Sequence, residues 1–223
     1  RSFQSVHSRM LSGPSVTSQL VSLLTRDRLP LPLNMSVAVG CFLYFAFGSN
    51  LLKERLQLAN PSAEFRTTGR LKDYKLNFGL WERQADNAWH GGVATIEPTP
   101  GAEVWGVVWT MSNDNLSSLD NQEGVNKGKY SPLEVSVETD EGPMLCRTYR
   151  MNNFHACPPS PQYKQVVCSG AEQNGLPVEY LKILEAVQTN NYTGPSVPAL
   201  VKQSLPRSER SASFPEPRHG DTD

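Results

Sequence analysis

The segment that most constrains the fold is an apolar run that stops at a glycine. Residues 42–47 read Phe-Leu-Tyr-Phe-Ala-Phe, and Gly48-Ser49-Asn50 follows at once. A run of this kind is typical of a strand buried on both faces. Gly48 can turn sharply and lets another group approach the main chain closely, and Asn50 is a good N-cap for a helix that begins at Leu51. The sequence therefore predicts a buried strand, a tight turn and the start of a helix.

Such a turn is also a candidate binding site. It directs free main-chain N–H groups at one point, and the dipole of the helix adds partial positive charge there. We therefore expect a small anion, such as a carboxylate, to fit at Gly48, Ser49 and Asn50. Many strand–helix turns bind nothing, so the rest of the chain has to identify the ligand.

The remaining pattern places most strands before the last helices. Strands are predicted over residues 64–68, 69–78, 93–97, 103–111, 133–137 and 145–151, with turns at 98–101 and 140–143. Helices are predicted over residues 51–59, from Ser112 or Asn113 to Gly124, from Ser160-Pro161 to Asn174 and from Pro177 to about Val187. This order indicates an α+β domain, a small mixed β-barrel-like core with flanking helices, and the apolar strand is expected in the middle of the sheet.

Both ends of the chain differ from this domain. Residues 1–40 are rich in serine and arginine and hold one acidic residue, Asp27. A mitochondrial presequence can have this composition, but we favour a disordered or artefactual extension, since initiation at Met35 would give a compact protein without it. We expect the catalytic domain over residues 41–194 and a disordered tail over residues 195–223, which are rich in Pro, Ser and Arg.

Charge and cysteine content narrow the possible partners. The chain has 21 Lys and Arg against 22 Asp and Glu, so nucleic acid and anionic membranes are not expected as partners. No apolar run approaches the roughly 20 residues needed to span a bilayer. The four cysteines (Cys41, Cys146, Cys157, Cys168) lack metal-binding spacing, so no metal is expected. We expect them to be reduced in a cytoplasmic protein, with a disulfide as the alternative.

Glu123 is the carboxylate with the least evident structural role. It lies at the C-terminal end of the predicted short helix, where the helix dipole disfavours a negative charge by roughly 0.3–1 kcal/mol. The same field, together with burial, would raise its pKa, which is what a general acid and base near neutral pH requires. The alternative is an exposed glutamate in a helix-ending turn, and composition alone favours that alternative.

Several segments of the chain resemble one enzyme family. Residues 42–52, 89–92 (Trp-His-Gly-Gly), 103–109, 119–125, 158–163 and 175–177 resemble segments of the γ-glutamylcyclotransferases, and the resemblance is continuous from about residue 42 to about residue 194. It implies a small mixed α/β barrel-like fold, a homodimer and a reaction without cofactors. In that reaction the α-amine of a γ-glutamyl amino acid attacks its own γ-carbonyl, which gives 5-oxoproline and releases the amino acid.

The resemblance also implies roles for individual residues. Glu123 matches the catalytic glutamate of the family and would act as general base and then as general acid. The main-chain N–H groups of Gly48, Ser49 and Asn50 would either hold the substrate's α-carboxylate or polarise its carbonyl oxygen. The residues leave both roles of the turn open.

The family pattern differs from this chain at Phe47, where a tyrosine is usual. A hydroxyl bonded within the fold would be worth about 0.5–1.5 kcal/mol, so we expect activity to survive with weaker substrate binding. The resemblance further implies that Phe47, Tyr130, Tyr149 and Tyr163 line the substrate pocket, with Tyr130 the best of the three tyrosines.

Two alternatives to this function stay open at the level of sequence. The chain could be a related cyclotransferase that acts on glutathione or on γ-glutamylamines. It could also be a non-catalytic binding protein on the same fold, which Phe47 favours and Glu123 disfavours.

Overall fold

The computed structural model describes residues 40–83 and 87–194. The predicted N-terminal extension, apart from Gly40, and the predicted tail at 195–223 lie outside the described residues, so both predictions stay untested. The strands are β1 (Cys41–Ala46), β2 (Glu64–Leu80), β3 (Val93–Ser112), β4 (Tyr130–Thr139), β5 (Gly142–Met151) and β6 (His155–Ala156). The α-helices are α1 (Lys53–Gln57), α2 (Leu116–Glu123), α3 (Pro161–Gln173) and α4 (Val178–Glu185). Short 3-10 helices η1 (Ser49–Leu51), η2 (Asn113–Asn115) and η3 (Val125–Lys127) connect them.

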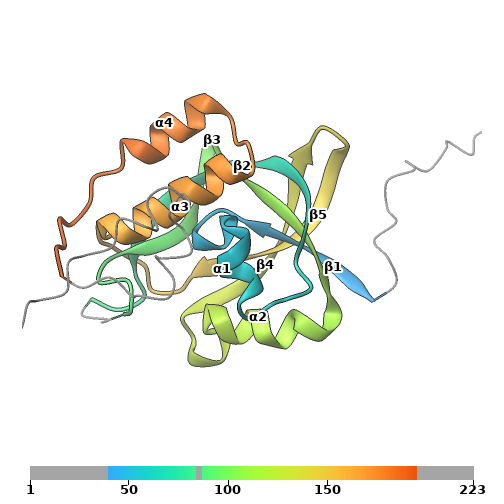
Figure 1. The fold of residues 1–223 in the computed structure, drawn as a ribbon, viewed down its shortest axis with the longest axis horizontal. Coiled ribbons are helices and arrows are strands. Elements are labelled where there is room, and N and C mark those ends of the chain that lie inside the picture. The colour runs from blue at the N-terminus through green and yellow to red at the C-terminus, as the bar shows by residue number, and fades with distance from the viewer. Residues whose placement is uncertain (1–39, 84–86, 195–223) are drawn as a thin grey trace, which may run out of the picture. The chain divides into compact units, whose positions relative to one another are not determined.

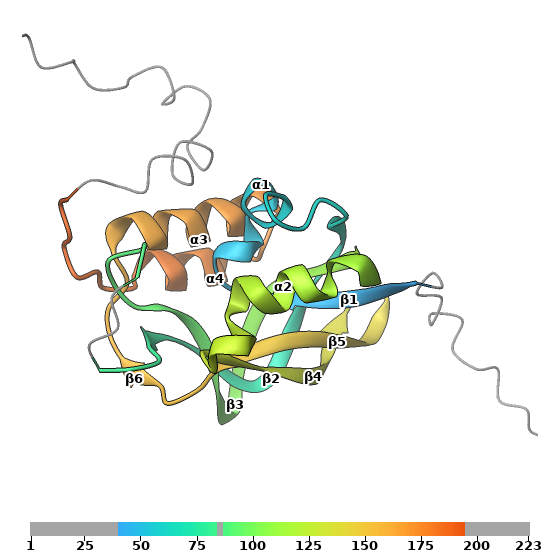
Figure 2. The ribbon, with the colours of Figure 1, turned by 90° about the horizontal axis from the view of Figure 1, so that it is seen from below.

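The strands close into a small barrel. The order is β3-β1-β5-β4-β2, β2 pairs back onto β3, and the short β6 extends the sheet beside β2. The helices lie together on one side of these strands, as Figures 1 and 2 show. The predicted α+β architecture with a barrel-like core and flanking helices is confirmed.

The apolar run occupies the interior of this sheet, as predicted. β1 lies between β3, to which it is antiparallel, and β5, to which it is parallel. The side chains of Phe45 and Ala46 are fully buried, and so is Trp109 of β3. A strand covered on both faces needs apolar residues at successive positions, which explains why the run does not alternate.

The two longest strands differ from the prediction. A turn was expected at residues 98–101 and a bend near residue 69, but β2 and β3 each run on without interruption and pair along most of their length. Register shifts between Phe65 and Thr67 and between Lys72 and Tyr74 supply the bending instead. Bulges of this kind bend a strand without ending it, and prolines and glycines can stand at such points.

The helix ends follow the sequence more closely. The Ser160 hydroxyl accepts a hydrogen bond from the N–H of Tyr163 at the start of α3, with Pro161 in the first turn. The predicted cap at Asn50 is wrong, because α1 begins at Lys53 and the residue before it, Leu52, makes no side-chain cap. Asn50 is buried and its amide binds elsewhere.

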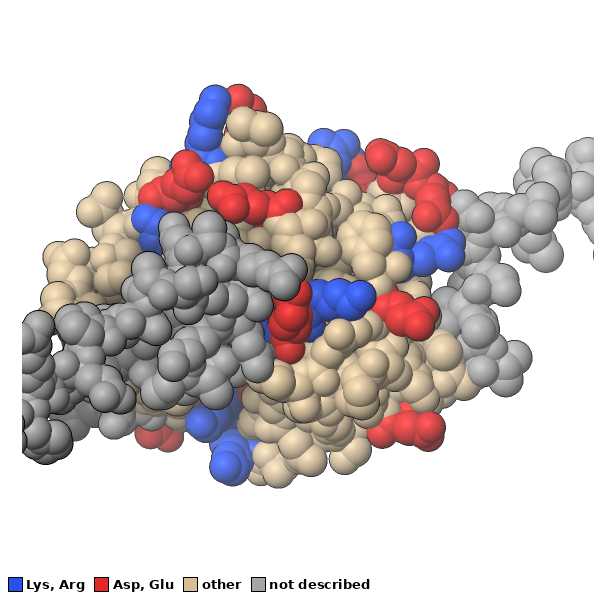
Figure 3. All heavy atoms as spheres, viewed as in Figure 1, with Lys and Arg blue, Asp and Glu red and all other residues tan. Residues whose placement is uncertain are grey.

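The surface of the described domain carries both signs of charge. In the face drawn in Figure 3, acidic and basic side chains are interspersed, and ion pairs such as Arg70 with Glu103 and Glu138 contribute to this pattern. All four cysteines are free thiols, as expected. Among the described residues, no helix is long and apolar enough to cross a membrane.

Candidate active site

The turn after β1 is held by close packing on two sides. A Cβ atom on Gly48 would lie 2.8 Å from the Cβ of Ala94 and 3.1 Å from the Tyr163 hydroxyl, so no larger residue fits there without a shift. The helix α3 packs against η1 from the other side, with Gly170 in contact with the main chain of Leu51 and Leu52. The turn is therefore wedged between β3 and α3.

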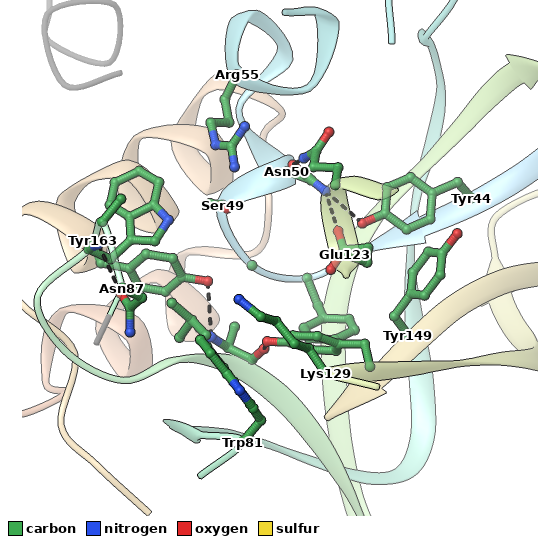
Figure 4. A pocket seen from close by; sticks show the side chains of 18 residues that line it. Tyr44, Ser49, Asn50, Arg55, Trp81, Asn87, Glu123, Lys129, Tyr149 and Tyr163 are labelled. Carbon is green, nitrogen blue, oxygen red and sulfur yellow. Dashed lines mark hydrogen bonds between the residues drawn. The ribbon is translucent and has the colours of Figure 1, made fainter. Parts of the chain in front are cut away.

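A pocket of about 300 Å³ opens beside this turn (Figure 4). It is lined by every residue for which the sequence predicted a role in the site: Phe47, Gly48, Ser49, Asn50, Glu123, Tyr130, Tyr149 and Tyr163. The fold thus brings Glu123, at the end of α2, to the turn that follows β1. Their roles toward a substrate stay predictions.

Glu123 is oriented by a series of side-chain amides. Asn50 donates from Nδ2 to the Glu123 carboxylate at 2.9 Å and to the Tyr44 hydroxyl at 3.0 Å. The Oδ1 of Asn50 accepts from Gln122 at 2.7 Å, and Gln122 in turn accepts from Asn60 at 2.7 Å. Because its oxygen is already taken by Gln122, the Asn50 amide presents its NH₂ group to Glu123. This use of Asn50 explains why it does not cap a helix.

The Glu123 carboxyl can gain or lose a proton near neutral pH. Burial raises its pKa to about 7, although the positive charge of Arg55 and the hydrogen bond from Asn50 both lower it, and the charge of Asp120 raises it slightly. Burial disfavours the carboxylate more than its neighbours favour it. A group with this pKa holds comparable amounts of acid and base at pH 7, which suits proton transfer in both directions.

Two of the predicted tyrosines bind the two backbone polar groups of one residue of β3, Ala94. Tyr130 donates its hydroxyl to the Ala94 carbonyl at 2.7 Å, and Tyr163 accepts from the Ala94 N–H at 2.9 Å. Burial raises the pKa of both hydroxyls, so both are neutral phenols in the pocket wall.

The third predicted tyrosine has a different environment. Tyr149 lines the pocket, but its hydroxyl donates to Asp120 and accepts from the Nε of Arg147 at 2.9 Å. Arg147 also binds both carboxylate oxygens of Asp120, at 2.7 and 3.0 Å. The hydroxyl of Tyr149 is therefore committed to this ion pair, and its ring is the part left to line the pocket.

The turn offers further donors to a ligand. Within the described chain, the N–H groups of Gly48 and Asn50 donate to no other backbone group, whereas those of Leu51 and Leu52 bond back to Gly48 and Ser49. The N–H groups of Gly48 and Asn50 therefore remain available to a ligand, as expected for the start of a helix. No group of three or more His, Cys, Asp and Glu side chains gathers as a metal site among the described residues.

Sequence reasoning missed other parts of the pocket wall, which also includes Tyr44, Arg55, Trp81, Asn87, Ala88, Trp89, Val93, Ala94, Gln122 and Lys129. Tyr44 looked like one more residue of an apolar run, and Gln122 stood unremarked beside Glu123. Arg55 lies one helical turn after the glycine turn, which was an available signal for it. Trp81 and Lys129 follow no motif and meet only in the fold.

Comparison with known proteins identifies relatives of this chain. The family model described as the AIG2-like family matches residues 103–184. A curated γ-glutamylcyclotransferase from Bos taurus is 57% identical over 154 residues, which cover 69% of this chain and 82% of that protein. Its counterpart from Homo sapiens is 56% identical over the same length. A solved structure described as a γ-glutamyl cyclotransferase superposes with a TM-score of 0.70 at 53% identity, over 72% of this chain and 95% of that one.

The barrel and its flanking helices define an α+β barrel protein, part of which the AIG2-like family model matches. The identity to curated relatives is specific enough to go one step further. The chain belongs to the γ-glutamylcyclotransferase family of enzymes.

Proposed function

We propose that the chain converts γ-glutamyl amino acids into 5-oxoproline and a free amino acid, with Glu123 as general base and general acid. One observation carries this proposal: a carboxyl whose pKa is raised to about 7 shares a small pocket with a glycine turn and lies 2.9 Å from the Asn50 amide of that turn. The nucleophile belongs to the substrate, so the protein has to supply a proton acceptor, a proton donor and a cradle.

The proposed reaction begins with the substrate folded back on itself. The Glu123 carboxylate removes a proton from the α-ammonium, and the amine nitrogen then bonds to the γ-carbonyl carbon, whose oxygen becomes an oxyanion. When the amide C–N bond breaks, Glu123 returns its proton to the departing nitrogen. The ring nitrogen loses its second proton to solvent and the released amine takes one up, so the protons balance. Orientation of the two ends supplies much of the acceleration.

The donors of the turn fit this reaction in either of two ways. The N–H groups of Gly48 and Asn50 lack backbone partners in the described chain, so they can hold the substrate's α-carboxylate or stabilise the oxyanion. The buried phenols of Tyr130 and Tyr163 complete the wall around the same space.

A substrate panel tests the reaction. Purified protein is incubated separately with γ-glutamyl-alanine, glutathione and γ-glutamyl-lysine joined through the lysine ε-amine, and 5-oxoproline is measured. We expect release from γ-glutamyl-alanine. Release from glutathione or from the γ-glutamylamine alone would identify a related cyclotransferase, and release from none would support a binding protein on this fold.

The variant Glu123→Gln tests the assigned carboxyl. It keeps the shape of the side chain but can neither accept nor return the proton, so kcat should fall by about 10²–10⁴. In the wild type, kcat/KM should rise with pH through the pKa of about 7, because the free enzyme must hold the carboxylate. Full turnover by a folded Glu123→Gln protein would refute the role.

Homodimerisation and a cytoplasmic location belong to the same proposal. The family resemblance supports a homodimer, which a mass measurement in solution tests. The free thiols of the described domain suit a reducing compartment, and localisation of the tagged full chain by microscopy tests that.

A further inference from the structure

The pocket wall holds two cationic side chains, and they come from opposite sides. Arg55 extends from α1 and Lys129 from the segment before β4. The Nε of Arg55 is buried and has no hydrogen-bond partner among the described residues. Within the same part of the chain, the Lys129 ammonium forms no ion pair and donates no side-chain hydrogen bond, and it lies over an aromatic ring. Both cations are therefore available to an anionic ligand.

Lys129 is held in place along its whole length. Its N–H donates to the Gly124 carbonyl at 3.1 Å, and its own carbonyl accepts from the N–H of Asn152 at 2.9 Å. Its stem packs against Gly124, where an added Cβ would lie 2.9 Å from the Cδ of Lys129. Its Nζ lies 3.8 Å from the centre of the Trp81 ring. A long side chain fixed in this way has lost much of its rotamer entropy before any ligand binds.

The position of Lys129 links it to the catalytic carboxyl. Gly124 follows Glu123 directly, so the residue that supports the lysine stem is the neighbour of the proposed acid and base. An ammonium over an indole face is attracted by the ring but keeps its three N–H donors free. Figure 4 shows the Lys129 side chain directed into the pocket, between Trp81 and Glu123.

The substrate of the proposed function carries two carboxylates, one on each half. The positive charge of Arg55 acts on Glu123, which has to reach the α-amine of the glutamyl half, and α1 follows the turn directly. Arg55 and the turn are therefore placed to bind the α-carboxylate, which the glutamyl half carries beside this amine. The second carboxylate, on the departing amino acid, is left for the other cation.

We propose that Lys129, positioned by Trp81, binds the carboxylate of the departing amino acid and makes the enzyme select γ-glutamyl compounds that keep this group. The inference rests on the proposed function and adds the specificity of its second half. It makes Lys129 a substrate-binding residue and Trp81 a positioning residue. An ammonium–carboxylate contact in a partly enclosed pocket should favour the charged substrate about tenfold.

The test compares γ-glutamyl-alanine with γ-glutamyl-alaninamide, which lacks only the second carboxylate. For Lys129→Gln, KM for γ-glutamyl-alanine should rise about tenfold with kcat little changed, and the amide should be used as by the wild type. Lys129→Arg should keep most of the preference. Trp81→Leu should reduce the preference in part. The matched control is Lys127→Gln, since Lys127 is exposed and does not line the pocket, and it should change neither substrate.

Two outcomes would overturn the assignment of Lys129. Equal losses with both substrates would place the lysine on the glutamyl carboxylate, and unchanged discrimination by a folded Lys129→Gln protein would remove it from binding. Binding of both compounds to the Glu123→Gln protein, with and without Lys129→Gln, is measured by calorimetry. A preference for the acid that depends on Lys129 there, combined with an inactive wild type, would refute the proposed reaction and leave the Lys129 site standing.

Discussion

Phe47 stands in the turn at the position where the family resemblance implies a tyrosine. Its ring is 8% exposed, packs at 6.4 Å from the ring of Phe45 and forms part of the pocket wall. A tyrosine would keep this ring and add one polar atom at its tip. The effect of that atom depends on whether a partner is within reach, which makes the substitution informative in either direction.

For Phe47→Tyr we expect KM for γ-glutamyl-alanine to fall roughly two- to tenfold, because one hydrogen bond contributes about 0.5–1.5 kcal/mol. Steady-state kinetics on both proteins measure it. A higher KM, together with a lower urea midpoint, would mean that the new hydroxyl is buried without a partner, and would contradict the expected gain.

At this scale, sequence predicted the residues that stand at ends of elements. Glu123 was found because a carboxylate is unfavourable at the end of a helix, and Gly48 because an apolar run stops there. The predicted helix cap at Asn50 was wrong, since the Gln122 amide that binds its side chain comes from another segment. Lys129 was missed because only the fold brings it to the pocket, whereas the place of Arg55 shortly after the glycine turn was a signal that went unused.

The helix α3 lies very close to the residues that follow the glycine turn. A Cβ on Gly170 would lie 2.5 Å from the Leu52 nitrogen and 2.7 Å from both the carbonyl carbon and the Cβ of Leu51. Most of these atoms are main chain, so they cannot rotate away as the tip of a side chain can. The absence of a side chain at Gly170 therefore allows the turn to pack this close to α3.

Gly170→Ala should reduce both stability and activity. Alanine is favoured in a helix by about 1 kcal/mol, but overpacking against main chain costs about 1–3 kcal/mol, and the displaced turn should lower kcat/KM. Urea denaturation and steady-state kinetics measure the two effects. Ser169→Ala, one residue earlier in α3, is the control and should stay within about 0.5 kcal/mol of the wild type. A more stable Gly170→Ala protein with full activity would contradict the packing argument.

The seam between β1 and β5 has little main-chain pairing. One parallel bridge joins Tyr44 to Arg147, and next to it the buried Thr148 hydroxyl donates to the Phe45 carbonyl at 2.8 Å. A side-chain hydrogen bond thus helps to join these two strands, whereas main-chain hydrogen bonds join the strands elsewhere in the barrel.

Thr148→Val keeps the shape of the side chain and removes this donor. Leaving a buried carbonyl without its partner should cost about 1–3 kcal/mol of unfolding free energy, measured by urea denaturation. Thr110→Val on β3 is the control, since the Thr110 hydroxyl makes no side-chain hydrogen bond to a described residue. Equal effects of both substitutions would show that the seam does not depend on Thr148.

Sequence predicted most helices and strands, but it divided the two longest strands into shorter ones. Residues 98–101 look like a turn because two prolines and a glycine stand there. In the fold, β2 supplies partners along the strand on both sides of this stretch, and that pairing outweighs the local preference for a turn. Local composition carries no information about a partner strand about thirty residues away, which is why the register shifts could not be foreseen.

The stability of the whole domain should depend on pH through Glu123. Its pKa is about 7 in the fold against 4.5 for the free group, so between these values the folded state binds more protons than the unfolded state. Its contribution is therefore fully present below about pH 4.5 and is lost as the pH rises through 7. The loss should amount to at most about 3.5 kcal/mol, since each pKa unit corresponds to about 1.4 kcal/mol.

Urea denaturation from about pH 5 to about pH 8 measures this dependence. The difference in unfolding free energy between wild type and Glu123→Gln should change steadily over that range, with the variant gaining relative to the wild type as the pH rises. Groups common to both proteins cancel in the difference. A difference that does not vary with pH would show that the carboxyl titrates alike in both states.

For the domain as a whole, the order of elements was enough to predict an α+β barrel-like core. The closure of the ring was not determined by sequence, because it depends on β2 pairing with β3 on one edge and meeting β4 at Arg70 and Glu138 on the other. Cross-strand contacts of this kind are set by tertiary packing.

The two tyrosines that bond to Ala94 both line the pocket, yet one binds the carbonyl of this residue and the other its N–H. Tyr130 has committed its hydrogen to the Ala94 carbonyl, so it can offer a ligand only lone pairs. Tyr163 accepts from the Ala94 N–H and is also hydrogen-bonded to Ser49 of the turn, so it joins β3 to the turn. A cyclising substrate brings an ammonium, which needs lone pairs, and a carbonyl oxygen that becomes negative, which needs hydrogens. The carbonyl and the N–H of Ala94 thus hold the two hydroxyls in different ways, and this part of the pocket wall is asymmetric before a substrate enters.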